Sequence, residues 1–456
     1  MVLLLIIIIQ MPFFISGMPI TLPEIEWHTI GNKLMAGSEL YVDVYHPTGP
    51  ISGLIYWMLS ILFFNSYFIY KLIALILILV QSTIFNVILI NNKAYNQNTY
   101  IPAVVYGLLM MSVEDFSTLS PQLICLTFVL MGIDLTFRKI EGRKKDDLSV
   151  LKIGLYYGIS MLIYPPSFLF IFPTIISFLF FTNTLLRRYL LLCLGFFLPF
   201  ILMWIKFFWF GQLKDLNFNF WFALWPNSTG GWLSWKPLVG TFLIPIIYFT
   251  LSFFRVSQST VFINYQVRLQ KFMLLLLLFA CLIVMVDYHK TSHILVILIP
   301  FLAFFITHLF LLMKKRFLSE VFFITFIALL ILQNYMGSFG WLSEYKLFDI
   351  RDQFYIENSF AMNDEGQKIL VLGDNISLYY KSELGTPYLS WNRADKQFSN
   401  MDQFDVVLKV FENFNNDLPK IIYDQNDRVP ELFRKIPRLK KNYEYSGNQM
   451  YIRNFD

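Results

Sequence analysis

Charged residues are scarce in this chain. Asp, Glu, Lys and Arg make up 15% of its 456 residues, hydrophobic residues make up 56%, and the mean hydropathy is +0.56. A water-soluble domain of this size needs a more polar surface, so the composition predicts a polytopic membrane protein. The net charge is only +5, and the basic residues form short clusters between apolar runs, so nucleic acid is not expected as a partner.

Cysteine is also rare, and glycine does not form a nucleotide-binding motif. The three cysteines, Cys125, Cys193 and Cys281, all fall inside apolar runs, which predicts buried thiols rather than a disulfide framework, a metal site or a redox pair. Gly373 and Gly385 are isolated, without the G-x-G-x-x-G spacing that cradles a dinucleotide. Neither redox chemistry nor nucleotide binding is therefore expected.

Long apolar runs fill residues 1–341, which we interpret as a transmembrane domain of about 11–13 helices that begins with an uncleaved span at Val2. Basic clusters near residues 138, 187, 255 and 314 should lie in the cytoplasm. They place residues 342–456 on the opposite side. Counting the runs back from residue 138 would put the acidic first loop, residues 18–50, in the cytoplasm, unless one of the short runs 51–64 and 99–113 is not a full crossing. We expect this loop outside on the strength of the family resemblance described below.

The composition changes after residue 341. The last 115 residues hold 33 of the 67 charged residues and no run long enough to span a membrane. Short apolar segments predict strands at Lys368–Leu372, Asp405–Val410 and Lys420–Tyr423, a helix start at 430–434, and a terminal hairpin over 442–452. The predicted fold class is thus an all-α polytopic membrane protein with a small soluble α/β domain at 342–456.

The stretch from Leu22 to Tyr56 is the one long polar insert among the early apolar runs. It contains Glu24, Glu26 and Asp43, and carboxylates at membrane depth are costly enough that these should lie at the water boundary. There they could be solvated loop residues, or one could act as a general base or bind a cation-bridged phosphate. Glu24 and Glu26 would project to the same side of an extended segment, so a pair of acids is also open.

The order of these features resembles the C-type superfamily of membrane glycosyltransferases, which includes protein O-mannosyltransferases and aminoarabinose transferases. In that superfamily the first loop typically runs acid-acid, aromatic, helical stretch, Gly, Tyr-x-Asp and prolines. The corresponding residues here are Glu24 and Glu26, Trp27, 30–35, Gly37, Tyr41-Val42-Asp43 and Gly49-Pro50, and the segments 369–380 and 418–425 resemble the soluble appendage of bacterial members. Pro23-Glu24-Ile25-Glu26 stands where an Asp-Glu pair is usual.

The resemblance implies a membrane glycosyltransferase that moves a sugar from a polyprenyl-phosphate-linked donor to an extracytoplasmic acceptor, in a divergent bacterial member of the superfamily. Glu26 or Glu24 would be the catalytic base, with Asp43 as the next choice. The alternative is a non-enzymatic multi-pass protein for transport, flipping or assembly. A transporter should carry ionisable groups in mid-span, and we find only Lys152, Lys206 and His308 in the apolar runs, which favours a site at the membrane surface.

Three further groups are candidates for substrate binding. Glu114 and Asp115 stand between two spans where some relatives carry an acid near the lipid phosphate, although an acid after a span end needs no function. His289, Lys290 and His293 form a compact cationic loop that could bind phosphate, unless Lys290 merely snorkels. Trp232 belongs to a tryptophan-rich outer segment that suits a membrane-interface belt or the stacking of a sugar ring.

These assignments define the expected partners: a polyprenyl-phosphate sugar, membrane lipid and an acceptor of unknown identity. No resident metal site is expected, although a divalent cation bridging a carboxylate and the phosphate is compatible with the chemistry. The expected location is a bacterial inner membrane with the C-terminal domain outside the cytoplasm. Glu24 and Glu26 are predicted to face a cavity together with the 204–236 and 287–293 loops.

Overall fold

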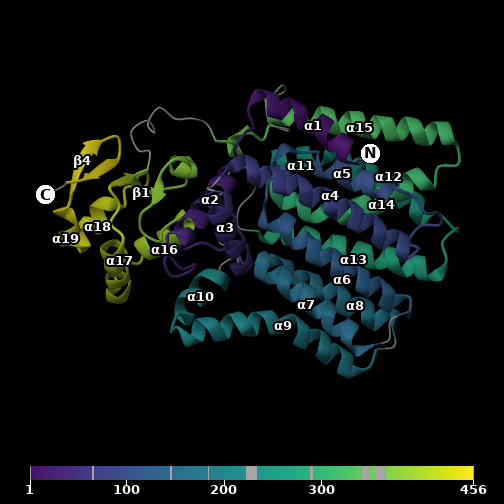
Figure 1. Ribbon diagram of the computed structural model, residues 1–456, viewed down its shortest axis with the longest axis horizontal. Coiled ribbons are helices and arrows are strands. Elements are labelled where there is room, and N and C mark those ends of the chain that lie inside the picture. Colours follow the sequence, from purple (N-terminus) through teal and green to yellow (C-terminus); the bar gives the residue numbers. More distant parts are fainter. Residues whose placement is uncertain are drawn as a thin grey trace. The chain divides into compact units, whose positions relative to one another are not determined.

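The computed structural model describes residues 2–63, 66–143, 146–182, 184–221, 234–287, 291–340, 349–355 and 366–454. The chain forms two compact units (Figure 1). The first unit comprises 1–19, 68–206 and 231–353, and the second comprises 20–67, 207–230 and 354–456. The expected boundary between residues 341 and 342 lies outside the described residues.

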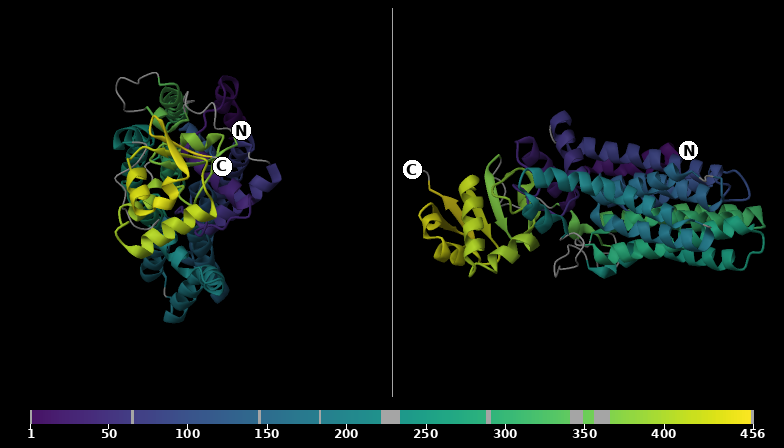
Figure 2. Two further views of the ribbon diagram at one scale, coloured as in Figure 1. Left: turned by 90° about the vertical axis from the view of Figure 1, so that its left-hand side faces the viewer. Right: turned by 90° about the horizontal axis from the view of Figure 1, so that it is seen from below.

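The first unit is helical, with long helices that run alongside one another (Figure 2). Its helices are α1 (Val2–Ser16), α4 (Tyr67–Asn91), α5 (Ile101–Met110), α6 (Pro121–Ile140), α7 (Asp147–Ile163), α8 (Ile171–Phe181), α9 (Leu186–Trp209), α11 (Trp235–Thr241), α12 (Leu243–Ser257), α13 (Asn264–Val286), α14 (Ile299–Leu311) and α15 (Arg316–Phe339). Short 3-10 helices are η1 (Glu114–Ser117), η2 (Pro165–Phe170) and η4 (Ser292–Leu298). Figure 1 labels most of the α-helices.

Five described helices are long and apolar enough to cross a membrane, or six if α11 and α12, which meet at a 55° bend, form one span. The five are Tyr67–Asn91, Leu186–Trp209, Asn264–Val286, Ser292–Leu311 and Arg316–Phe339. Shorter apolar helices cover Val2–Ser16, Pro50–Phe63, Ile101–Met110 and Pro165–Phe181. The polytopic helical class is confirmed. The runs expected at 51–64 and 99–113 are indeed among the short helices.

Glycines allow α7 and α9 to cross closely. A Cβ on Gly154 would lie 2.1 Å from the Leu192 carbonyl oxygen, and one on Gly195 would lie 2.2 Å from the Leu151 carbonyl oxygen. Both distances are far below van der Waals contact, so neither position tolerates a side chain without moving a backbone. Small residues at a helix crossing are typical of membrane proteins, where close backbone approach contributes to association.

The second unit contains a mixed five-stranded sheet in the order β2-β1-β3-β5-β4. Its strands are β1 (Lys368–Leu372), β2 (Glu383–Leu384), β3 (Ile421–Asp424), β4 (Tyr443–Gly447) and β5 (Met450–Arg453). β1 is parallel to β2 and β3, whereas β5 is antiparallel to both β3 and β4. Its helices are α2 (Leu22–Met35), α3 (Pro50–Phe63), α10 (Leu213–Phe220), α16 (Trp391–Phe398), α17 (Phe404–Asn416), α18 (Val429–Lys435) and α19 (Pro437–Lys440).

The α/β class of the C-terminal region is confirmed, and so are most of its predicted elements. β1 has the predicted bounds, β3 lies within one residue of its prediction, and β4 and β5 form the terminal hairpin. The strand predicted at Asp405–Val410 is wrong, because these residues belong to α17. Val410 and Phe414 are buried four residues apart, and Val407 and Phe411 pack beside them on the same core, which is helical spacing.

The first polar loop is part of this second unit and packs on its sheet. Tyr45 lies in the same buried cluster as Leu370, Leu372 and Ile422 of the sheet. Its backbone N–H donates to the Pro387 carbonyl at 2.8 Å. The first loop and the C-terminal sheet therefore share one hydrophobic core, and the side of the membrane on which they lie stays a prediction.

Candidate functional site

Helix α2 carries both glutamates of the first loop. It begins after Thr21, and Pro23 occupies its first turn, where a missing N–H leaves no helical bond unmade. The Glu24 carboxylate accepts hydrogen bonds from the Thr21 backbone N–H at 2.8 Å and from the Thr21 hydroxyl at 3.1 Å. This carboxylate therefore helps to close the N-terminus of the helix, as the acid of a capping box does.

Glu26 lies in a different environment, beside a histidine. Its side chain is 1% exposed, and its Oε2 is 3.3 Å from His46 Nε2. His46 Nδ1 accepts a hydrogen bond from the Thr48 N–H at 3.1 Å. In the neutral ring the proton is therefore on Nε2, facing the carboxylate. The structure thus places a buried carboxylate and an imidazole in contact within the first loop.

Glu24 and Glu26 do not form the pair that an extended segment would have produced. The segment is helical, and residues two apart on a helix project to nearly opposite sides. Each acid consequently has its own surroundings: Glu24 faces the helix start and Glu26 faces His46. Both are buried, so neither is a loop acid in bulk water.

Asp43 organises the turn that follows α2. Its Oδ2 accepts the Glu39 N–H at 2.8 Å, and its own N–H donates to the Glu39 carbonyl at 2.9 Å. The turn carries Tyr41 at φ 75°, a left-handed conformation, and the Tyr41 hydroxyl donates to the Thr48 carbonyl at 2.6 Å. These contacts give Asp43 a clear structural role.

The burial of His28, one turn from Glu24 on α2, predicts that the free energy of unfolding depends on pH. Burial lowers the pKa of His28 to about 3, and its ring centroid lies 3.8 Å from that of Tyr67. The folded state therefore resists protonation, whereas the unfolded chain binds a proton below pH ~6.5. The contribution of His28 to the free energy of unfolding is complete above that pH. It falls by about 1.4 kcal/mol per pH unit as the pH drops from ~6.5 towards 3. Thermal unfolding between pH 7.5 and 5 should show this loss, and His28→Phe should reduce it. An unchanged slope in His28→Phe would contradict the assignment.

In the first unit, Glu114 is held in a buried ion pair. Glu114 Oε1 lies 2.5 Å from Lys71 Nζ, and Glu114 Oε2 accepts the Gln10 side-chain N–H at 3.0 Å. All three side chains are almost fully buried. From the sequence we missed Lys71, and also Asp134, as charged residues within apolar runs. The signal was present, because Lys71 is an isolated basic residue in the first turns of α4.

Asp115, next to Glu114, lies against His293. Its Oδ2 accepts the His293 backbone N–H and the Ser292 hydroxyl, both at 2.7 Å, and lies 3.5 Å from His293 Nδ1. The Gln353 side chain bonds both the backbone N–H and the hydroxyl of Ser292. The structure therefore brings together two of the predicted substrate-binding residues, Asp115 and His293. His289, Lys290 and Trp232 lie outside the described residues.

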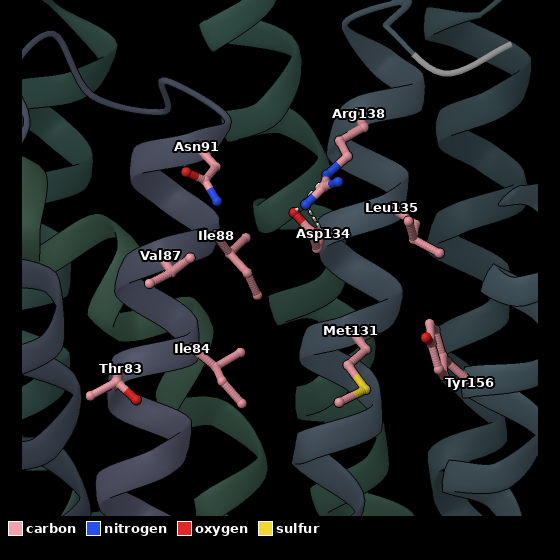
Figure 3. Close-up of a pocket in the computed structure, with 10 residues that line it drawn as sticks. All are labelled: Thr83, Ile84, Val87, Ile88, Asn91, Met131, Asp134, Leu135, Arg138 and Tyr156. Atoms are coloured by element: carbon pink, nitrogen blue, oxygen red, sulfur yellow. Dashed lines mark hydrogen bonds and ion pairs between the residues drawn. The ribbon is translucent and has the colours of Figure 1, made fainter.

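A further ionisable pair, between Asp134 and Arg138, lies in a pocket of about 360 Å³ between α4, α6 and α7 (Figure 3). Asp134 also accepts the Asn92 side-chain N–H at 2.8 Å. Ile84, Ile88 and Met131 line the apolar part. Asp134 and Arg138 neutralise each other's charge, and we do not assign a catalytic role to this pocket.

Metal-binding side chains do not gather in the described part of the chain. No group of three or more His, Cys, Asp or Glu side chains there is arranged to hold a metal ion. A cation bridging one protein carboxylate and a substrate phosphate needs no such cluster. That part of the expectation therefore stays a prediction.

Comparison with known proteins decides the fold. No protein-family model matches the sequence, and no curated protein matches it. The structure is similar to the crystal structure of ArnT from Cupriavidus metallidurans bound to undecaprenyl phosphate, with a TM-score of 0.56. The match covers 98% of this chain and 96% of that chain at 10% sequence identity. The chain has the C-type glycosyltransferase fold. The predicted resemblance is thereby confirmed at the level of fold, over nearly the whole chain.

Proposed function

We propose that this protein is a membrane glycosyltransferase that uses a polyprenyl-phosphate-linked sugar. The observation that carries the proposal is the buried contact between Glu26 and His46 in the first loop of a C-type glycosyltransferase fold. A carboxylate removed from water and fixed by a second polar group is suited to proton transfer. The solved structure with the same fold holds undecaprenyl phosphate, which supports a lipid-phosphate partner here.

In the proposed reaction, an acceptor oxygen attacks C1 of the donor sugar. The bond between C1 and the phosphate oxygen breaks, and polyprenyl phosphate leaves with the bonding electron pair. Glu26 takes the proton of the attacking hydroxyl, while His46 positions the carboxylate through the Nε2 contact. Hydrogen-bond donors of the 289–293 segment, with a divalent cation where one is bound, would stabilise the charge of the departing phosphate.

The proposed location is a bacterial inner membrane. The first loop and the C-terminal domain would face the outside, because the basic clusters near 138, 187, 255 and 314 favour the cytoplasm. The donor's sugar and phosphate would then be met at the outer surface, where the acids of the first loop can act without burying charge in lipid.

Lys290 provides the test of donor binding. If its ammonium group contacts the lipid phosphate, Lys290→Ala should weaken the binding of undecaprenyl phosphate by about 1.5–3 kcal/mol, the range for a charged hydrogen bond. Lys290→Arg should have a smaller effect, since the charge is kept. Native mass spectrometry of the full chain, titrated with undecaprenyl phosphate in detergent micelles, measures both. The proposal fails if the wild-type protein does not bind this lipid saturably, and equal affinity in all three proteins removes Lys290 from the site.

A further inference from the structure

The second unit contains a cavity that the proposed reaction does not yet use. Its volume is about 530 Å³. Its wall is formed by the C-terminal half of α2 and the turn that follows, by β2 and the loop after it, and by the end of α17. Polar side chains dominate the wall, and the residues that matter most are Asn32, Lys33, Asp43, Lys368, Thr386 and Asp417.

Thr386 is the unusual residue of this wall. Its side chain is 1% exposed, yet its hydroxyl has no hydrogen-bond partner among the described residues. Burying a hydroxyl without a partner costs about 1–3 kcal/mol. Its backbone is also left-handed, at φ 65°, which is rare for a β-branched residue. Two unfavourable features at one position of a cavity wall indicate a site where a ligand supplies the missing contact.

The backbone on both sides of Thr386 is held by hydrogen bonds. The Gly385 N–H donates to the Ile369 carbonyl at 2.8 Å, and the Pro387 carbonyl accepts the Tyr45 N–H at 2.8 Å. Asn32 on α2 also lines the cavity, and its side-chain oxygen is likewise buried without a partner in the described part of the chain. One hydroxyl and one amide oxygen are thus available to a polar ligand.

The charges of the wall exclude a strongly anionic ligand. Lys33 and Lys368 both bind the Asp417 carboxylate, the latter at 2.8 Å, and Lys33 also donates to the Leu384 carbonyl at 2.8 Å. Burial raises the pKa of Asp417, but its hydrogen bonds to the two lysines outweigh that effect and lower it below the ordinary value. With Asp43 and Glu383, the wall holds three carboxylates against two ammonium groups.

The cavity lies on the same face of α2 as Glu26. Thr29 and Lys33, which line the cavity, follow Glu26 by three and seven residues, and this spacing places side chains on one helix face. Three residues advance a helix by about 4.5 Å. A ligand of several ångströms that fills the cavity along α2 therefore extends towards the proposed base.

We propose that this cavity binds a neutral, hydroxyl-rich carbohydrate that serves as the acceptor; the acceptor role rests on the proposed transferase function. Sugar hydroxyls both donate and accept hydrogen bonds, so they match the hydroxyl of Thr386, the amide of Asn32 and the carboxylate of Asp43. None of the described residues that line the cavity is aromatic, so hydrogen bonds rather than ring stacking select the ligand.

The test is binding of fluorescently tagged full-length protein in lipid nanodiscs to an array of neutral and acidic oligosaccharides. The wild type should retain neutral glycans. Thr386→Val keeps the shape and removes the hydroxyl, and should weaken the retained binding about tenfold, the factor for one hydrogen bond. Thr386→Ser keeps the hydroxyl and should bind as the wild type does. Asn32→Ala, a change compatible with a helix, should also weaken binding and provides a second variant with an undisturbed loop.

Three results would overturn the inference: no neutral glycan retained by the wild type, retention of phosphorylated or sulfated glycans only, or binding by Thr386→Val and Asn32→Ala that equals binding by the wild type. Undecaprenyl phosphate titrated into the same preparations separates this inference from the proposed function. Glycan binding without lipid binding would leave the cavity assignment standing and refute the transferase. Lipid binding without glycan binding would refute the cavity assignment and leave the proposed transferase function standing.

Discussion

Glu26→Gln should lower the rate of sugar transfer about 10²–10⁴-fold, the contribution of a positioned general base. Glutamine keeps the size of the side chain and can still approach His46 Nε2, but it cannot accept the acceptor proton. Initial rates of transfer, measured on protein in nanodiscs, give the result directly. The thermal unfolding temperature should change little, because the side-chain oxygen of glutamine can still accept a hydrogen bond from His46 Nε2.

Glu24→Gln is the matched control, two residues away on the same helix. Its effect should fall on stability, by about 1 kcal/mol, because the amide is a weaker acceptor for the Thr21 N–H at the helix start. Its transfer rate should stay within a few-fold of wild type. Activity that survives the double change Glu24→Gln, Glu26→Gln would leave Asp43 or a non-enzymatic role as the remaining explanations.

Lys71→Met should destabilise the protein by about 3–5 kcal/mol, the effect of removing one partner from a buried ion pair. Glu114 would be left charged and buried. Among the described side chains, Gln10 and Ser117 would still donate hydrogen bonds to it. The double change Lys71→Met, Glu114→Gln removes both charges and should recover most of that loss. Chemical unfolding in detergent micelles measures the cycle. If the double variant is as unstable as the sum of the single variants, the pair is not coupled as the structure indicates.

The sequence predicted those elements whose pattern is local. The strands β1 and β3 and the terminal hairpin were found because each is a short apolar run bounded by turn residues. Asp405–Val410 failed for a physical reason: its valines favour a strand over six residues, whereas the helical repeat becomes visible only when Phe411 and Phe414 are included.

The candidate site depends on contacts that no local pattern encodes. Glu26 and His46 are 20 residues apart and meet because α2 and the turn after it fold back on each other. Asp115 and His293 belong to helices η1 and η4 and are 178 residues apart in the sequence. The strained backbone of Thr386 and its unpartnered hydroxyl have no sequence signal, since threonine is an ordinary residue in a loop.

Turnover of the donor lipid tests the central claim most directly. Polyprenyl-phosphate sugars extracted from the producing cells would be incubated with purified protein and the membrane fraction as a source of acceptor, and followed by mass spectrometry. We expect one lipid-linked sugar to disappear and polyprenyl phosphate to appear in equal amount with the wild-type protein, and neither change with Glu26→Gln. If the wild type consumes no lipid-linked sugar, or Glu26→Gln consumes it at the wild-type rate, the proposed transferase mechanism is wrong.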